Sequence, residues 1–180
     1  MRTAIRAVTV TTLTAALGYQ GGAQALSFTY QHVMIPVRDG VRLETVIMTP
    51  TNASGPLPIL LRRTPYGVPA NANGMSSPAL EDLVRDGYIF VVQNLRGRFG
   101  SEGTFELTSK TDLKNPKATS ETTDAYDSID WLVKNVPSNN GKVGVYGVSY
   151  DGLTAAMTLL KPHPALKAIS EQASPADQSG

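Results

Sequence analysis

Two short, uninterrupted apolar runs constrain the fold of this chain more than any other feature. They lie at residues 59–61 (Ile-Leu-Leu) and 89–92 (Ile-Phe-Val-Val). Neither run alternates with polar residues, which is typical of strands buried on both faces of a parallel sheet. Between them, residues 78–85 carry apolar side chains on one side of an expected helix that ends before Gly87. The order of strand, helix and strand predicts a parallel pair joined by a crossover.

The pattern on either side of this unit extends the same arrangement. A leading antiparallel hairpin is expected, because two strand-like segments flank the tight-turn signal at Asp39 and Gly40. Further along, helix and strand patterns alternate. The expected elements are strands over 28–37 and 41–48, a helix over 122–136 closed by residues 139–141, a strand over 142–146, a helix over 151–160 and a strand over 166–169. The predicted fold class is α/β, with a mostly parallel, doubly wound sheet entered by an antiparallel hairpin.

Length and charge narrow the classes of function. The chain has 180 residues, enough for one ordinary domain, and its 41% hydrophobic content suffices to bury a core. The net charge of +1 gives no long-range field that would favour binding to nucleic acid. There are no cysteines, so neither a disulfide framework nor a thiolate metal site is possible.

The N-terminal residues 1–25 have the order of a secretory signal peptide. Two arginines precede an apolar, threonine-rich stretch over 7–17, and Ala-Gln-Ala follows with its last residue at Ala25. The alternative is a short first helix of the fold. We expect cleavage near Ala25, a secreted or periplasmic protein of residues 26–180, and no membrane span after removal of the signal, because the apolar stretch is too short for an anchor.

Ser149 lies in a setting that suits a nucleophile. A serine hydroxyl is presented to a substrate when the backbone turns sharply from strand to helix, and small residues are needed where such a turn crowds itself. Here Gly147 precedes the serine by two residues, between a valine-containing strand and an expected helix. The usual Gly-x-Ser-x-Gly is altered, because Asp151 stands two residues after the serine and glycine follows only at Gly152. The alternative is an ordinary turn in which Ser149 caps the helix.

Several ordered segments accompany the serine motif and together resemble one family. They are Arg-Thr-Pro-Tyr-Gly at 63–67, Asn-Leu-Arg-Gly-Arg-Phe-Gly-Ser-Glu-Gly at 94–103, Asp-Ala-Tyr-Asp-Ser-Ile-Asp-Trp-Leu at 124–132, Gly-Lys-Val-Gly at 141–144 and Pro-His-Pro-Ala-Leu-Lys at 162–167. The chain resembles the family of X-prolyl dipeptidyl peptidases, cocaine esterase and α-amino acid ester hydrolases. Within it, the α-amino acid ester hydrolase and glutaryl-cephalosporin acylase branch is the most similar. The resemblance implies an α/β-hydrolase core.

The resemblance also implies roles for two tyrosines. In the family, the tyrosine of the Thr-Pro-Tyr-Gly segment donates its phenol hydrogen to the oxyanion, and the amide after the nucleophile is the second donor. These positions are Tyr66 and the amide of Tyr150. The alternative for Tyr66 is an amphipathic tyrosine at the edge of the core. The implied substrate is a small ester, an amide or a short peptide, and neither metal nor organic cofactor is implied.

Other polar residues near these motifs have simpler interpretations. Asp151 in the first turn of a helix is a partner for the helix dipole, and we assign it no catalytic role. Arg96, Arg98 and Glu102 lie in a glycine-rich loop that fits neither phosphate-binding fingerprint, so a solvated or internally ion-paired loop is expected. Trp131 is expected to pack in the core.

A general base for Ser149 is not evident. Of the two histidines, His32 precedes the serine, and His163 lies at the far end of the helix that Ser149 opens, roughly 15 Å away for ten helical residues. In the family, the acid and the histidine come much later, beyond an inserted cap domain and before a jelly-roll domain. We therefore expect the chain to be the N-terminal part of a longer catalytic domain.

The expected activity is that of a serine hydrolase that cleaves an ester or amide bond through an acyl-serine intermediate. Two alternatives stay open. One is a truncated, non-catalytic fragment without the acid and histidine of the triad, and the other is an X-prolyl dipeptidyl peptidase.

Overall fold

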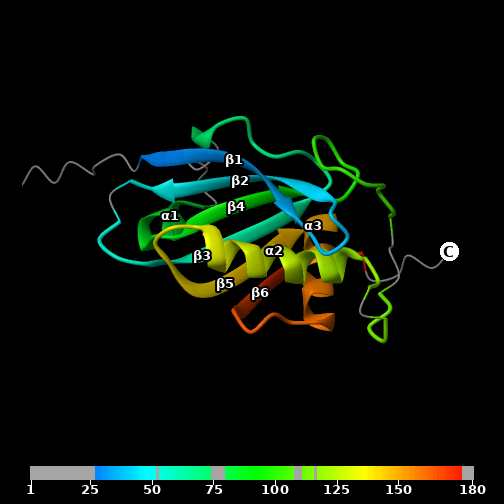
Figure 1. Cartoon of the computed structure of the whole chain (residues 1–180). Helices are drawn as coiled ribbons and strands as arrows, with labels where there is room; N and C mark the ends of the chain where they lie inside the picture. The colour runs from blue at the N-terminus through cyan, green and yellow to red at the C-terminus, as the bar shows by residue number, and fades with distance from the viewer. Residues whose placement is uncertain (1–26, 52, 74–79, 108–110, 116, 176–180) are drawn as a thin grey trace, which may run out of the picture.

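The computed structural model describes residues 27–51, 53–73, 80–107, 111–115 and 117–175. The expected signal peptide, residues 1–25, lies outside them. The described strands form one six-stranded sheet in the order β1-β2-β4-β3-β5-β6 (Figure 1). Their bounds are Phe28–Pro36 for β1, Arg42–Pro50 for β2, Leu57–Thr64 for β3, Ile89–Asn94 for β4, Asn139–Val148 for β5 and Leu166–Gln172 for β6.

The pairing of these strands confirms the predicted fold class. β1 and β2 form the leading antiparallel hairpin, and β2 continues antiparallel to β4. The pairs β3–β4, β3–β5 and β5–β6 are parallel. The two uninterrupted apolar runs lie in β3 and β4, side by side in the interior of the sheet, where both of their faces are covered.

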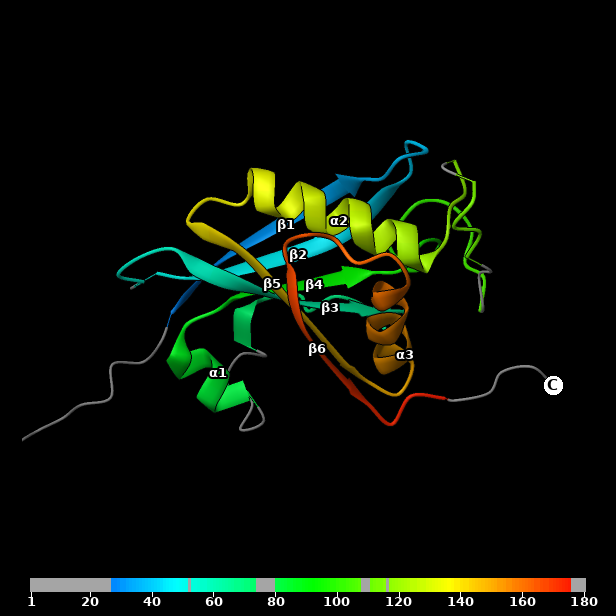
Figure 2. The same cartoon turned by 90° about the horizontal axis from the view of Figure 1, so that it is seen from below.

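Helices cover both faces of the sheet (Figure 2). α1 (Glu81–Asp86) packs on one face with Val84, beside Phe90 and Val92 of β4. α2 (Glu121–Asn135) and α3 (Tyr150–Met157) pack on the other, and a 3₁₀ turn, Thr158–Leu160, extends α3. The sheet is therefore doubly wound, as the alternating pattern predicts.

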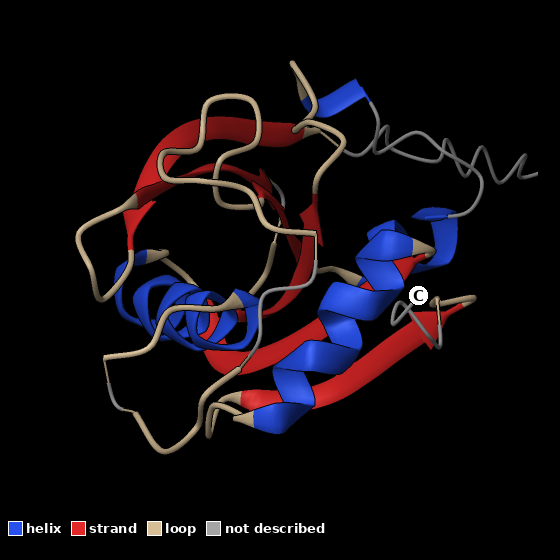
Figure 3. Cartoon of the chain, turned by 90° about the vertical axis from the view of Figure 1, so that its right-hand side faces the viewer, coloured by secondary structure: helices blue, strands red, loops and turns tan. Residues whose placement is uncertain are grey.

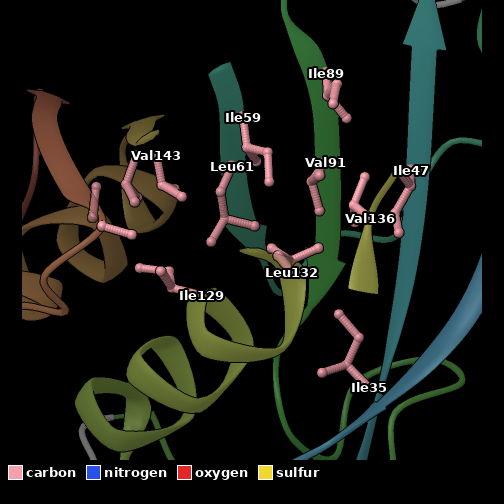
Figure 4. Packing of buried hydrophobic residues seen from close by; sticks show 13 residues of the cluster. Ile35, Ile47, Ile59, Leu61, Ile89, Val91, Ile129, Leu132, Val136 and Val143 are labelled. Atoms are coloured by element: carbon pink, nitrogen blue, oxygen red, sulfur yellow. The ribbon is translucent and has the colours of Figure 1, made fainter. Parts of the chain in front are cut away.

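The larger core cluster lies between α2 and the sheet (Figure 4). Ile129 and Leu132 project from α2 toward Leu61 of β3 and Val91 of β4, and all four side chains are fully buried. Each such side chain stabilises the fold by about 1.5–3 kcal/mol through burial. Trp131 packs partly buried against the same cluster, as expected.

The predicted boundary between the helix over 122–136 and the next strand is wrong. Residues 139–141 were expected to close the helix, and the next strand to begin only at 142. In the structure, α2 ends at Asn135 and β5 already begins at Asn139, which pairs with Leu57. Asn139 both closes the helix and starts the strand. Its side-chain amide donates to the carbonyl oxygens of Val133 (3.1 Å) and Val136 (2.6 Å) at the end of the helix, and its backbone is already part of the sheet.

The carboxyl ends of the parallel strands all lie along one side of the sheet, called here the carboxyl edge, and Figure 3 looks onto it. β3 ends at Thr64, two residues before Tyr66, and β5 ends at Val148, immediately before Ser149. Because β3 and β5 are neighbours, the fold brings both segments to the same edge, which is where open α/β sheets bind their ligands.

Candidate active site

Ser149 occupies a strained turn between β5 and α3. Its φ of 61° and ψ of −128° lie in a region that residues with a side chain rarely adopt. The side chain makes no capping hydrogen bond to α3, and the residue is exposed. An ordinary N-cap serine has an extended backbone and accepts a hydrogen bond from the first turn of its helix. The geometry of Ser149 therefore differs from that of a helix cap and leaves its hydroxyl open to solvent.

The glycines around the turn are required by close contacts. A Cβ atom on Gly147 would lie 2.2 Å from the carbonyl carbon and oxygen of Asp151. A Cβ atom on Gly152 would lie 2.7 Å from the carbonyl oxygen of Gln172 at the end of β6. At position 151 the side chain has room, so the second glycine of the motif is needed at 152. The altered spacing noted in the sequence thus has a steric cause.

The backbone amides of the turn divide into one that is engaged and one that is open. The amide of Ser149 donates to the carbonyl oxygen of Gln172 at 3.0 Å. Tyr150 is the first residue of α3, so its amide has no intrahelical acceptor and points out of the positive end of the helix. The Tyr150 phenol is turned away and donates to the carbonyl oxygen of Leu107. Burial, with the charge of Glu121, raises the pKa of this phenol to about 12.

Tyr66 is exposed at the same edge of the sheet. Its side chain is 64% exposed, which argues against a role in the core. Its amide donates to the hydroxyl of Thr64 at 3.2 Å, which fixes the turn that follows β3. A cavity of about 390 Å³ opens beside it. The cavity is lined by Glu44, Arg62, Tyr66, Gly67, Val68, Pro69, Asn94, Phe99 and Gly100.

Neither histidine is held beside Ser149. His32 lies on β1 and contacts Glu44 through its Nε2 at 2.9 Å. His163 follows the 3₁₀ turn beyond α3, with its Nε2 3.4 Å from Asp130 of α2. Its Nδ1 accepts from the amide of Ala165, so both ring nitrogens are engaged away from the turn. These contacts agree with the expectation that His163 is not the base.

Arg96 and Glu102 of the glycine-rich loop are ion-paired, as expected, with partners on neighbouring elements. Arg96 binds Asp39 of the hairpin turn at 2.6 Å and Asp124 of α2 at 2.7 Å. Glu102 pairs with Arg42 of β2, and the Arg98 guanidinium donates to the carbonyl oxygen of Pro65 at 3.0 Å. The loop joins the hairpin, α2 and the Tyr66 turn.

Asp151 lies in the first turn of α3, where its charge suits the helix dipole. The structure shows a second feature that the sequence analysis missed. Its side chain is buried and reaches β3, where one carboxylate oxygen lies 3.8 Å from Nε of Arg62. No short-range pattern indicates this contact, because 89 positions separate residues 62 and 151.

The described residues offer neither a metal site nor a membrane-spanning helix. No cluster of three or more histidine, aspartate or glutamate side chains there could hold a metal ion. No helix in the described ranges is long and apolar enough to cross a membrane.

Residues 39–180 match the family described as X-Pro dipeptidyl-peptidase (S15 family). The chain belongs to this family. Cocaine esterase from Rhodococcus sp. (strain MB1 Bresler) is 38% identical to this S15 chain over 147 residues, which are 81% of the chain and 24% of the esterase. A putative serine esterase from Mycobacterium bovis is 27% identical over 158 residues, covering 78% of the chain and 24% of that protein.

Solved structures agree with this assignment. An α-amino acid ester hydrolase superimposes on the S15 chain with a TM-score of 0.74 and 39% identity, over 91% of the chain and 29% of the hydrolase. An aminopeptidase from a marine sediment Thaumarchaeota archaeon gives a TM-score of 0.75 and 41% identity, over 84% of the chain and 26% of that protein. The S15 chain therefore has the fold of hydrolases and spans about a quarter of the length of the relatives it matches.

Proposed function

We propose that the protein is a serine hydrolase that cleaves an ester or amide bond through an acyl-serine intermediate on Ser149. The hydroxyl oxygen of Ser149 attacks the substrate carbonyl carbon, and the phenol of Tyr66 and the amide of Tyr150 hold the resulting oxyanion. The leaving group departs with a proton, and water then releases the acyl group from the serine. The observation that carries the proposal is the exposed Ser149 hydroxyl on a strained turn, with an open amide immediately after it.

The chemistry requires a general base, which takes the proton of the Ser149 hydroxyl. His32 and His163 are held by Glu44 and Asp130. We therefore propose that the base is a histidine outside the described residues, supplied when the full-length protein folds around this edge of the sheet.

The test is the substitution Ser149→Ala in the full-length protein, assayed with a nitrophenyl ester. We expect kcat to fall by at least about 10³-fold, because the nucleophile is lost. Ser138→Ala is the matched control, since Ser138 is also exposed and also has a positive φ, of 58°, but lies at the opposite end of β5. Hydrolysis that survives in the Ser149→Ala protein at the wild-type rate would remove the proposal.

A fluorophosphonate probe tests the alternative of a non-catalytic fragment. The probe labels a serine only where a base activates it. We expect Ser149 to be labelled in the full-length protein and to stay unlabelled in the 180-residue chain. Labelling in the 180-residue chain would show that the base lies within it after all.

Two substrate classes have specific support. Identity of 38% to cocaine esterase favours an ester, whereas the description of the matched family favours an X-prolyl peptide. Both would pass through the same acyl-serine. Comparing kcat/KM for a nitrophenyl ester with that for an X-prolyl nitroanilide decides between them, and we propose that the ester is preferred.

We also propose that residues 1–25 direct export and are removed near Ala25, on the signal-like order of charged, apolar and small residues. Mass spectrometry of the protein secreted by its native host should then give a chain that begins at Leu26. A protein recovered with Met1 in place would contradict export by cleavage.

A further inference from the structure

We propose, resting on the proposed function, that Arg98 is a positioning residue that holds the Tyr66 phenol where it converges with the Tyr150 amide. Arg98 lies in the glycine-rich loop that follows β4. One end of this loop contacts the turn that carries Tyr66, and the other end contacts the side chain of Tyr150. The Arg98 guanidinium lies between these two contacts.

The position of Tyr66 depends on its backbone neighbours. Its side chain is 64% exposed, so packing does not fix it. On one side, the carbonyl oxygen of Pro65 accepts a hydrogen bond from Nε of Arg98 at 3.0 Å. On the other side, Gly67 lies against the ring of Phe99, where a Cβ atom on the glycine would be 3.3 Å from the nearest ring atom. Two consecutive residues of the loop therefore hold both neighbours of Tyr66.

The far end of the loop holds the side chain of Tyr150. The Phe105 ring packs against the Tyr150 ring, with the two centroids 6.2 Å apart. The Tyr150 phenol donates to the carbonyl oxygen of Leu107. Because Tyr150 is the first residue of α3, these contacts fix the end of the helix whose amide is the second oxyanion donor.

The Arg98 guanidinium joins the two ends of the loop. Its Cζ lies 5.5 Å from the centroid of the Phe99 ring and 5.2 Å from that of the Phe105 ring, within the range of cation–π contacts. Gly97, with a φ of 68°, lets the loop fold back so closely that a Cβ atom there would lie 2.2 Å from the amide nitrogen of Phe105. A planar guanidinium can stack on rings and still donate a directed hydrogen bond, which a lysine ammonium cannot do.

Arg98 also differs from the other arginines that contact the loop. Arg96 and Arg42 each bind a carboxylate. Among the described residues, the Arg98 side chain instead contacts the Pro65 carbonyl and two rings, one against Gly67 and one against Tyr150. Its contacts thus all lead to the two segments that carry the oxyanion donors.

The consequence concerns the transition state. An oxyanion is fully stabilised only when its donors converge on it, and a misplacement of about 1 Å can cost about 10²-fold in rate. Tyr66 follows β3 and Tyr150 follows the turn after β5, so the loop is a bridge between donors from different strands. Loss of Arg98 should lower kcat and leave KM nearly unchanged, because ground-state binding does not require convergence.

The experiment compares Arg98→Met, Tyr66→Phe and the double variant of the full-length protein, with kcat and KM measured on a nitrophenyl ester per serine titrated by a fluorophosphonate. We expect Arg98→Met to lower kcat by about 10- to 100-fold and to change KM by less than about 3-fold. In the Tyr66→Phe background the same substitution should cost less than about 3-fold, because the phenol that Arg98 positions is already absent. An equal loss in both backgrounds would mean a general structural effect and would overturn the inference.

Arg98→Lys separates position from charge. Lysine keeps the positive charge without the planar fork, so kcat should stay at least about 5-fold below that of the native protein. Full kcat in this variant would show that charge alone suffices and would overturn the positioning role.

Arg42→Met is the matched control, because Arg42 holds the same loop through Glu102 and contacts neither donor segment. An exposed ion pair contributes little, so its kcat should stay within about 2-fold of the native value. A loss as large as that of Arg98→Met would assign the effect to the loop as a whole and overturn the role of Arg98.

Failure of this inference and failure of the proposed function give different results. Unchanged kcat in Arg98→Met, together with a large loss in Tyr66→Phe, would overturn the inference alone. Unchanged kcat in Tyr66→Phe would remove Tyr66 from the proposed function and the inference with it. Retained hydrolysis in Ser149→Ala would overturn the proposed function itself.

Discussion

The strain at Ser149 makes a quantitative prediction about stability. At a φ of 61° and ψ of −128°, a residue with a Cβ atom is strained, whereas glycine is not. Ser149→Gly should therefore give a more stable protein than Ser149→Ala, although both remove the hydroxyl. The comparison is clean because the native side chain makes no capping hydrogen bond that either variant would lose.

The magnitude follows from two opposing terms. Relief of the strained backbone is worth about 1–3 kcal/mol. Glycine also lowers the free energy of unfolding by about 0.4–1 kcal/mol, because it increases the conformational entropy of the unfolded chain. The net gain of Ser149→Gly over Ser149→Ala is then about 1 kcal/mol, which at a slope of about 2 kcal/mol per molar corresponds to a shift of about 0.5 M in the urea midpoint.

The assay is urea unfolding of both variants followed by circular dichroism, with ester hydrolysis measured in parallel. Ser138→Gly is the control, since Ser138 has a φ of 58° and lies away from the sheet edge that carries Ser149. It should change stability and leave hydrolysis intact, whereas both Ser149 variants should be inactive. Equal midpoints for Ser149→Gly and Ser149→Ala would refute the argument that the turn stores strain.

Three further predictions concern other parts of the structure. Tyr66→Phe should lower kcat on a nitrophenyl ester by about 10²–10³-fold, as for loss of one oxyanion donor, and leave the urea midpoint unchanged because the side chain is 64% exposed. Glu121→Gln should reduce the free energy of unfolding by about 3 kcal/mol, since it leaves the buried Arg63 guanidinium, now 3.0 Å from the carboxylate, without its counter-charge. The hydrogen bond from the Arg96 guanidinium holds the pKa of Asp39 below its ordinary 3.8. The ion pair therefore stabilises the fold above pH 3.8, and this stabilisation is lost as the pH falls through the lower pKa of the folded state. Asp39→Asn should therefore lower the urea midpoint at about pH 6, and the difference from the native protein should shrink as the pH falls below 3.8.

The fold was largely predictable because burial leaves its pattern in the sequence. Runs such as 89–92 can avoid polar residues only where both faces of a strand are covered, and β4 is such a strand. The stripe that contains Ile129 and Leu132 likewise gave α2 and the face it buries. The boundary at Asn139 was not predictable in this way, because turn-type composition does not reveal that one side chain closes a helix while its backbone starts a strand.

The site was predictable only where its residues stand at strand ends. Ser149 and Tyr66 follow expected strands, so the topology of a parallel sheet brings them to one edge, and their catalytic roles stay predictions. The Asp151 contact with Arg62 depends on how closely α3 approaches β3, which no local pattern encodes. A first-turn acid has a sufficient explanation in the helix dipole, and that explanation concealed the second contact.

The altered serine motif illustrates what such a pattern encodes. The requirement at this turn is that no Cβ atom stand where two backbones meet, and here they meet at Gly147, against Asp151, and at Gly152, against Gln172 of β6. Position 151 faces β3 and has space for a side chain, so a glycine there would satisfy the usual pattern and lose the carboxylate that lies beside Arg62. The spacing of glycines therefore reports which neighbouring strand approaches the turn, and Asp151 occupies the position that this approach leaves open. We infer that a departure of this kind strengthens the interpretation of a nucleophile turn when the structure shows a contact that requires it.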